Sequence, residues 1–370
     1  MRKLFRKWPL FCLGAFLLIT VVAQATGTVN KQEQEASKEG EELTRLNSED
    51  KAQLIEFLRL KKMFGSSVWP NFCEAEIPLI QYNDQYEFLV AHPSPPAPWA
   101  VVDNDTFQGS PYHRRNAGES QAFAVPVGDL WAGSLDTLSH MNRSMKKQLQ
   151  EKIPQEKLTP VMIKMMEITP AQHVVYLFHE AFHAFQAVQV HDRFLRANGV
   201  YASEKHYPFE DEGFKNAWNK EGSLLAAAFR EKDESERHEL IQRFLEIRTK
   251  RRSDASLSQK LIAFERELEW LEGLAKYVEM RFSELGSSQK GETESKAYRI
   301  VRNRLQADFS WRIAKLGDLH GDQRFYLSGA IQAMILDKIS PSWKQEIIRQ
   351  ENIGLEDLLQ TAVVNKRRLN

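Results

Sequence analysis

Two histidines and a glutamate lie close together in an otherwise apolar stretch of this chain. The stretch reads His179-Glu180-Ala181-Phe182-His183. On an α-helix, side chains at positions i and i+4 lie on one face, so both imidazoles can reach the same metal ion. Glu180 projects about 100° further round the helix, where it can hold a water on that metal without being a ligand. This spacing is typical of the zinc site of metallohydrolases.

A single long helix over residues 169–199 is expected to position this motif. Thr169-Pro170-Ala171-Gln172 fits a capping box with proline at the first helical position, and Gly199 is a natural stop. Apolar residues surround the motif on nearly all sides of the helix, which predicts burial in a core. Buried histidines and glutamates are costly unless they are partnered. We therefore favour a bound metal over two structural histidines that only form hydrogen bonds.

The third protein ligand must come from another part of the chain. A catalytic zinc usually has three protein ligands and one open position for water. Residues 184–189 lack the metzincin extension, in which a third histidine follows the motif. Glutamates on two predicted helices, 212–230 and 257–285, are the candidates. They are Glu221, Glu269, Glu272 and Glu279. Helical geometry does not separate Glu272 from Glu279, because both lie at the edge of the apolar stripe of helix 257–285, and it places Glu269 further round towards solvent.

The sequence after the motif resembles a known group of enzymes. A downstream helix containing Trp270-Leu271-Glu272-Gly273, together with the first motif, resembles the gluzincins. This zinc peptidase group includes thermolysin-like and aminopeptidase-N-like enzymes. The resemblance implies Glu272 as the third zinc ligand and a mainly helical, thermolysin-like catalytic part. The exopeptidase signature Gly-x-Met-Glu-Asn is absent, and Leu271 replaces the asparagine that many gluzincins carry, so no single family is indicated.

A second match concerns the stabilisation of negative charge during catalysis. Residues 325–330 read Phe-Tyr-Leu-Ser-Gly-Ala, which is similar to the Tyr-x-x-Gly-Ala helix start of the aminopeptidases. The resemblance implies that Tyr326 donates a hydrogen bond to the oxyanion. His320 is a second candidate donor, and a packed tyrosine without a catalytic role is the alternative for Tyr326.

These residues predict a zinc metallopeptidase that uses one Zn²⁺ ion and acts on a peptide or protein. Glu180 is the expected general base, because a purely structural metal site needs only ligands. Two alternatives remain. One is a secreted metal-binding or structural protein without turnover, and the other is a zinc hydrolase that cleaves a bond other than a peptide bond.

The N-terminus predicts export. A basic segment at residues 2–7 precedes an apolar run at residues 10–23, and Ala23-Gln24-Ala25 is a cleavage site of the A-x-A type. Cleavage after Ala25 predicts a secreted or periplasmic protein with no membrane span in the mature chain. The alternative is an uncleaved N-terminal membrane anchor, although the run is shorter than the roughly 20 residues that usually span a bilayer.

Charge and cysteine content narrow the class of partner. The formal net charge is zero, and the first 25 residues contain four basic residues and no acid, so the remainder carries −4. That balance argues against a nucleic-acid partner. Cys73 is the only cysteine after residue 25, so no internal disulfide is expected.

The rest of the chain predicts an α+β fold. Residues 26–46 are polar and predict a flexible leader. Residues 47–168 predict a helix at 47–64 and a small antiparallel sheet with strands near 77–82, 86–91, 99–102 and 122–127. Pro126 fits best on an edge strand, to which an extended peptide substrate can add. Residues 169–370 predict the helical zinc-site part.

Overall fold

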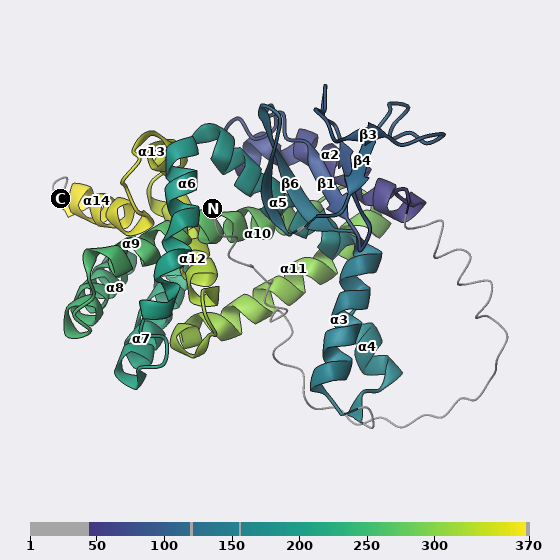
Figure 1. Ribbon diagram of the computed structural model, residues 1–370. Coiled ribbons are helices and arrows are strands. Elements are labelled where there is room, and N and C mark those ends of the chain that lie inside the picture. Colours follow the sequence, from purple (N-terminus) through teal and green to yellow (C-terminus); the bar gives the residue numbers. More distant parts are fainter. Residues whose placement is uncertain (1–43, 119–120, 155–156, 368–370) are drawn as a thin grey trace. The chain divides into compact units, whose positions relative to one another are not determined.

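The computed structural model describes residues 44–118, 121–154 and 157–367 (Figure 1). The predicted signal peptide, residues 1–25, and almost all of the predicted leader lie outside these ranges. The described chain has the expected α+β composition. It divides into two compact units, the first within residues 1–59 and 76–181 and the second within 60–75 and 182–370. Helices α2 (Ser48–Val68) and α5 (Pro170–Gln189) each run from one unit into the other.

The first unit is built on a six-stranded sheet with the order β3-β4-β2-β1-β6-β5. Its strands are β1 (Leu79–Tyr82), β2 (Tyr86–Val90), β3 (Ala100–Val101), β4 (His113–Asn116), β5 (Phe123–Val127) and β6 (Leu130–Asp136). All neighbours pair antiparallel except β1 and β6, which are parallel with Leu79 opposite Gly133. The expected antiparallel sheet is therefore wrong for this pair, because side-chain alternation has the same period in both kinds of strand.

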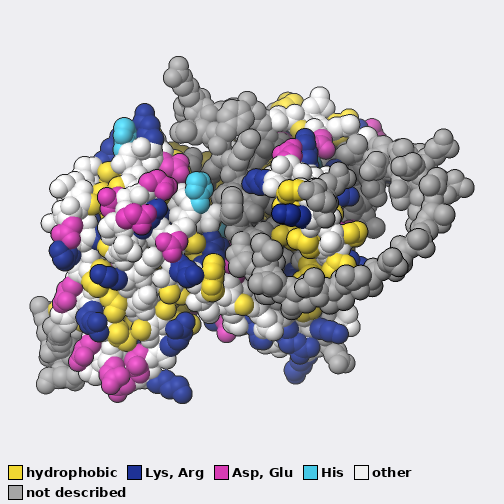
Figure 2. All heavy atoms as spheres, turned by 90° about the horizontal axis from the view of Figure 1, so that it is seen from below, with side chains coloured by type: hydrophobic (Ala, Val, Ile, Leu, Met, Phe, Trp, Pro, Cys, Tyr) yellow, Lys and Arg dark blue, Asp and Glu magenta, His cyan; other side chains and the backbone are white. Residues whose placement is uncertain are grey.

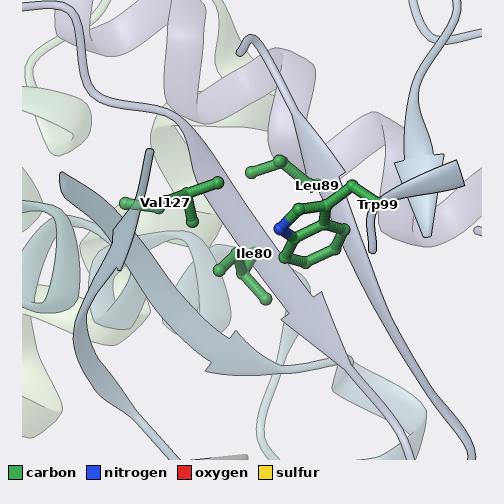
Figure 3. Close-up of a cluster of buried hydrophobic side chains, with 5 residues drawn as sticks. Ile80, Leu89, Trp99 and Val127 are labelled. Atoms are coloured by element: carbon green, nitrogen blue, oxygen red, sulfur yellow. The ribbon is translucent and has the colours of Figure 1, made fainter. Parts of the chain in front are cut away.

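One face of the sheet carries a cluster of buried apolar side chains, in which the labelled residues of Figure 3 point toward one another. The cluster consists of Ile80, Leu89, Trp99, Val127 and Ala132. Pro126 lies on β5, an outer strand of the sheet, as predicted. An outer strand tolerates proline because the missing N–H leaves no ladder hydrogen bond unmade.

Strand β6 packs against α5 within the first unit, and a glycine makes the close approach possible. A Cβ atom built on Gly133 would lie 2.8 Å from the Cα and N atoms of Ala181. The backbone of β6 therefore lies directly beside the helical turn that carries Glu180.

The start of α5 is capped as predicted, because the Thr169 hydroxyl accepts a hydrogen bond from the N–H of Gln172 at 3.3 Å.

The expected single helix over 169–199 is wrong, because the chain breaks at Val190. Helix α5 ends at Gln189, and α6 (His191–Gly199) begins after Val190, whose backbone angles are φ −143° and ψ 64°. β-branched residues lose side-chain freedom in helices and accept extended backbone more readily. The break turns α6 so that its buried Arg193 forms an ion pair with Glu267 at 3.1 Å.

The remaining elements are helical. The first unit also contains α3 (Leu138–Lys152) and α4 (Pro160–Met166). The second unit contains, besides α6, the elements η2 (Val200–His206), α7 (Glu212–Arg230), α8 (Glu234–Asp254), α9 (Gln259–Leu268), η3 (Glu269–Gly273), α10 (Leu274–Ser287), α11 (Glu292–Arg312), η4 (Ile313–Asp318), α12 (Gln323–Ile339), α13 (Trp343–Arg349) and α14 (Leu355–Arg367). The helix predicted over 257–285 is present as α9, η3 and α10, and its middle turn, η3, is π-helical.

The core of the second unit is rich in aromatic rings that meet edge to face. The ring of Trp69 lies 4.9 Å from that of Phe182 and 5.3 Å from that of Trp343, measured between centroids. Helix α12 packs tightly on η3 through two glycines, since a Cβ on Gly273 would lie 2.5 Å from the Cα of Gly329. The glycine contact holds η3 directly against α12 within the second unit.

Acidic and basic side chains are interspersed on the face seen in Figure 2, as a net charge of zero would suggest. Within the described ranges, no helix combines the length and the apolar character that crossing a membrane requires. Cys73 is partly buried and forms no disulfide with any residue that the structure describes, and its thiol donates to the carbonyl of Lys62 at 3.4 Å.

Candidate metal centre

The two histidines of α5 lie beside a glutamate of the π-helical turn η3. His179, His183 and Glu272 each offer one ligand atom, and these atoms all lie within 4.8 Å of one another. The Nε2 atom of His183 is 3.4 Å from the Oε2 atom of Glu272. All three side chains are at most 2% exposed. The three residues predicted as ligands are thus brought together.

This donor set matches what a catalytic zinc requires. Zn²⁺ binds imidazole nitrogen and carboxylate oxygen, and three protein ligands leave one position open for water. A carboxylate buried beside two imidazoles is costly unless a positive charge compensates it. A divalent cation bound by His179, His183 and Glu272 would supply that charge. The residues present therefore fit Zn²⁺.

Glu180 lies between the two histidines on α5 and is 1% exposed. Tyr82, on strand β1, is close enough for the charge of Glu180 to affect its pKa. Burial raises the pKa of Tyr82 far above its ordinary value, and Asp136 and Glu180 raise it further. Tyr82 donates a hydrogen bond to Asp136 at 2.7 Å. The phenol of Tyr82 therefore stays protonated, and its strand β1 pairs with β6, which packs on α5.

A tyrosine that the sequence did not single out contacts Glu272, the candidate third ligand. Tyr201, in η2, donates to the Oε1 atom of Glu272 at 3.4 Å and to Asp322 at 2.9 Å. The second oxygen of Glu272 is the one that faces His183. One carboxylate oxygen is thus held by a hydroxyl, while the other points to the imidazole. No motif marks Tyr201, because its partners lie far along the chain.

The rival glutamates all face cations. Glu221 pairs with Arg248 at 2.9 Å and also with Arg251. Glu269 pairs with Arg248 at 2.7 Å, and Glu279 pairs with Lys276 at 2.6 Å. These ion pairs account for the burial of each carboxylate. None of the three belongs to the group formed with His179 and His183.

Tyr326 lies on α12 and is partly buried. It follows Asp322, the acceptor for Tyr201, by one helical turn, so both lie on the same side of the helix. His320 precedes α12 in the chain. The oxyanion-donor role of Tyr326 or His320 stays a prediction, and Tyr201 is a third candidate donor because its hydroxyl contacts Glu272 directly.

Arg251 pairs with Glu265 as well as with the rival glutamate Glu221. This network of buried ion pairs predicts that the free energy of unfolding falls in acid. Glu265 contacts Arg251 at 2.6 Å and Arg252 at 2.7 Å. Burial alone would raise the pKa of Glu265, but the two arginines lower it to about 2. A depressed carboxylate pKa stabilises the fold fully above the ordinary value of about 4.3, and this stabilisation is lost as the pH falls through the folded-state value.

Urea unfolding of the wild type and of Glu265→Gln, followed from pH 6 down to pH 2, tests this expectation. The wild type should exceed the variant in free energy of unfolding by a constant amount above about pH 4.5, and the excess should shrink steadily below that pH. An excess that is independent of pH across the range would contradict the prediction.

Models of protein families, curated proteins and solved structures yield no match to this chain. Support for a metal centre therefore comes from the geometry and burial of His179, His183 and Glu272, and from the chemistry of these side chains.

Proposed function

We propose that this chain is a zinc-dependent metallopeptidase. The observation that carries the proposal is the convergence of His179, His183 and Glu272, with Glu180 buried beside them on the same helix. A carboxylate between two ligands is superfluous in a structural site. It is what a hydrolytic site needs for proton transfer.

Each residue has a defined task in this mechanism. When bound, Zn²⁺ acts as a Lewis acid and lowers the pKa of a coordinated water from about 15.7 to about 7. His179, His183 and Glu272 would hold the ion. Glu180 accepts a proton from the attacking water and passes it to the leaving amine. A hydroxyl or imidazole, from Tyr326 or His320, donates to the oxyanion that develops on the carbonyl.

An extended peptide is the substrate that the sheet favours. Strand β5 is an outer strand, and its neighbour β6 packs against the turn of α5 that carries Glu180. An open strand edge binds extended peptides through main-chain hydrogen bonds. The export signal predicted at residues 1–25 would direct such an enzyme to secreted or periplasmic substrates.

Glu180→Gln separates catalysis from metal binding. The variant should bind about one zinc ion per chain, like the wild type, because Glu180 is not a ligand. Its rate of peptide hydrolysis should fall by about 10²–10⁴-fold, because the general base is lost. The measurements are zinc content by atomic emission and cleavage of a quenched-fluorescence peptide library by the mature chain. Glu167→Gln, which alters an exposed carboxylate between α4 and α5, should leave both unchanged.

Four outcomes would contradict the proposal. Undiminished cleavage by Glu180→Gln would remove its role as base, and absence of zinc from the wild type would remove the metal centre. Bound zinc with no hydrolysis of any substrate would favour a metal-binding protein without turnover. Cleavage of ester substrates but of no peptide in the library would favour a zinc hydrolase for a non-peptide bond.

A further inference from the structure

Gln186 connects one metal-ligand candidate to the turn that carries another. It follows His183 on α5 and is completely buried. Its Oε1 atom lies 3.0 Å from His183 Nδ1. Its Nε2 atom donates to the carbonyl oxygen of Trp270 at 2.9 Å and to that of Leu271 at 3.2 Å. All of these residues belong to the second unit, and both carbonyls belong to η3, next to Glu272.

These contacts determine which nitrogen of His183 carries the proton. A carbonyl oxygen only accepts hydrogen bonds, so the side of the Gln186 amide that faces Trp270 and Leu271 must be the NH₂ group. The amide oxygen then faces Nδ1 of His183, and Nδ1 must donate. The lone pair of the neutral ring is therefore on Nε2, the atom 3.4 Å from the Glu272 carboxylate. That tautomer presents Nε2 as the metal-binding atom.

The turn that Gln186 contacts needs external support. A π-helical turn interrupts the regular hydrogen bonding of an α-helix, is rare, and occurs frequently at functional sites. On η3, Arg248 forms two hydrogen bonds to Glu269, of 2.7 and 2.9 Å, and α12 packs against Gly273 through Gly329. Gln186 adds a link from the carbonyls of the same turn to a metal-ligand candidate.

We propose that Gln186 is a positioning residue that sets the tautomer of His183 and the placement of the η3 turn together, so that His183 Nε2 and Glu272 are presented to one divalent metal ion. The inference rests on the metal centre of the proposed function, but it does not depend on the nature of the bond that is cleaved. Side chains that orient metal ligands are typically worth about 10–100-fold in metal affinity.

Titration with Co²⁺ and Zn²⁺ tests this role without a substrate. In Gln186→Leu, affinity for both ions should fall about 10–100-fold, and the visible absorption of bound Co²⁺ should change because the ligand geometry changes. Gln186→Glu keeps an acceptor for His183 Nδ1 but loses the donor to the two carbonyls. Its affinity should lie between those of the wild type and Gln186→Leu, again with an altered spectrum. Gln172→Leu, which loses a hydrogen bond to Tyr176 on the same helix, should match the wild type.

A folded Gln186→Leu variant with wild-type affinity and spectrum would overturn the inference. If that variant does not fold, a Gln186→Glu variant with wild-type affinity and spectrum would overturn it equally. A wild-type chain that binds neither ion would remove the metal centre and this inference together. A wild-type chain that binds both ions but cleaves no peptide would contradict only the peptidase proposal, and the ranking of the variants would still decide the role of Gln186.

Discussion

Glu272→Ala is expected to abolish stoichiometric zinc binding. The substitution removes the carboxylate that faces His183 at 3.4 Å, and leaves two imidazoles to hold the ion. Loss of a direct ligand should cost more than the roughly 10–100-fold that outer contacts contribute to metal affinity. Peptide hydrolysis should fall to background, because no ion remains to activate water. Zinc content after dialysis and a competition titration against a fluorescent chelator measure the change.

Glu279→Ala is the matched control, because Glu279 is also buried on the same long helical segment. Its carboxylate pairs with Lys276, so its loss should lower stability without removing zinc. The opposite pattern, in which Glu279→Ala loses zinc and Glu272→Ala retains it, would reassign the third ligand. Retention of zinc by both variants would show that neither glutamate is essential to the site.

Local spacing along one helix was sufficient to predict the histidine pair, whereas the choice of a candidate third ligand needed more than spacing. The periodicity of α5 alone places His179 and His183 on one face. By the same criterion Glu272 and Glu279 look equivalent, and Glu269 is expected to turn towards solvent, which is wrong because it is buried beside Arg248. What distinguishes the candidate glutamates is which cations they face, and Arg248 contacts two of the rivals across the fold. Such long-range pairing leaves no periodic trace in the sequence.

Strands β4 and β6, which were not predicted from the sequence, lack the local residue patterns typical of strands. Strand β6 reads Leu-Trp-Ala-Gly-Ser-Leu-Asp and contains no β-branched residue, and β4 reads His-Arg-Arg-Asn. Neither has the composition that favours strands; both are strands because their neighbours pair with them. The π-helical turn and the contacts of Gln186 escape prediction for a related reason, since the partners of Gln186 include backbone carbonyls whose location depends on tertiary structure.

Arg248→Met is expected to cause a large loss of stability. The guanidinium is 1% exposed and contacts Glu221, Glu269 and Glu356 at 2.9, 2.7 and 2.9 Å. Burial alone would lower the pKa of Arg248, but the three carboxylates hold it well above its ordinary value. Removing the cation leaves buried carboxylates without their shared partner, which typically costs about 3–5 kcal/mol. Urea unfolding near neutral pH measures the free energy of unfolding for comparison with the wild type.

Lys250→Met provides the control on the same helix. Lys250 pairs with Asp254 at 2.8 Å, but the two side chains are 74% and 62% exposed, and exposed pairs contribute about 0–1 kcal/mol. Because Arg248 also holds Glu269 in η3, folded Arg248→Met should bind Co²⁺ more weakly than Lys250→Met does. Equal stability of the two variants would show that the network does not depend on Arg248. Equal Co²⁺ affinity, with stability lost as expected, would show that the η3 turn keeps its shape without the arginine.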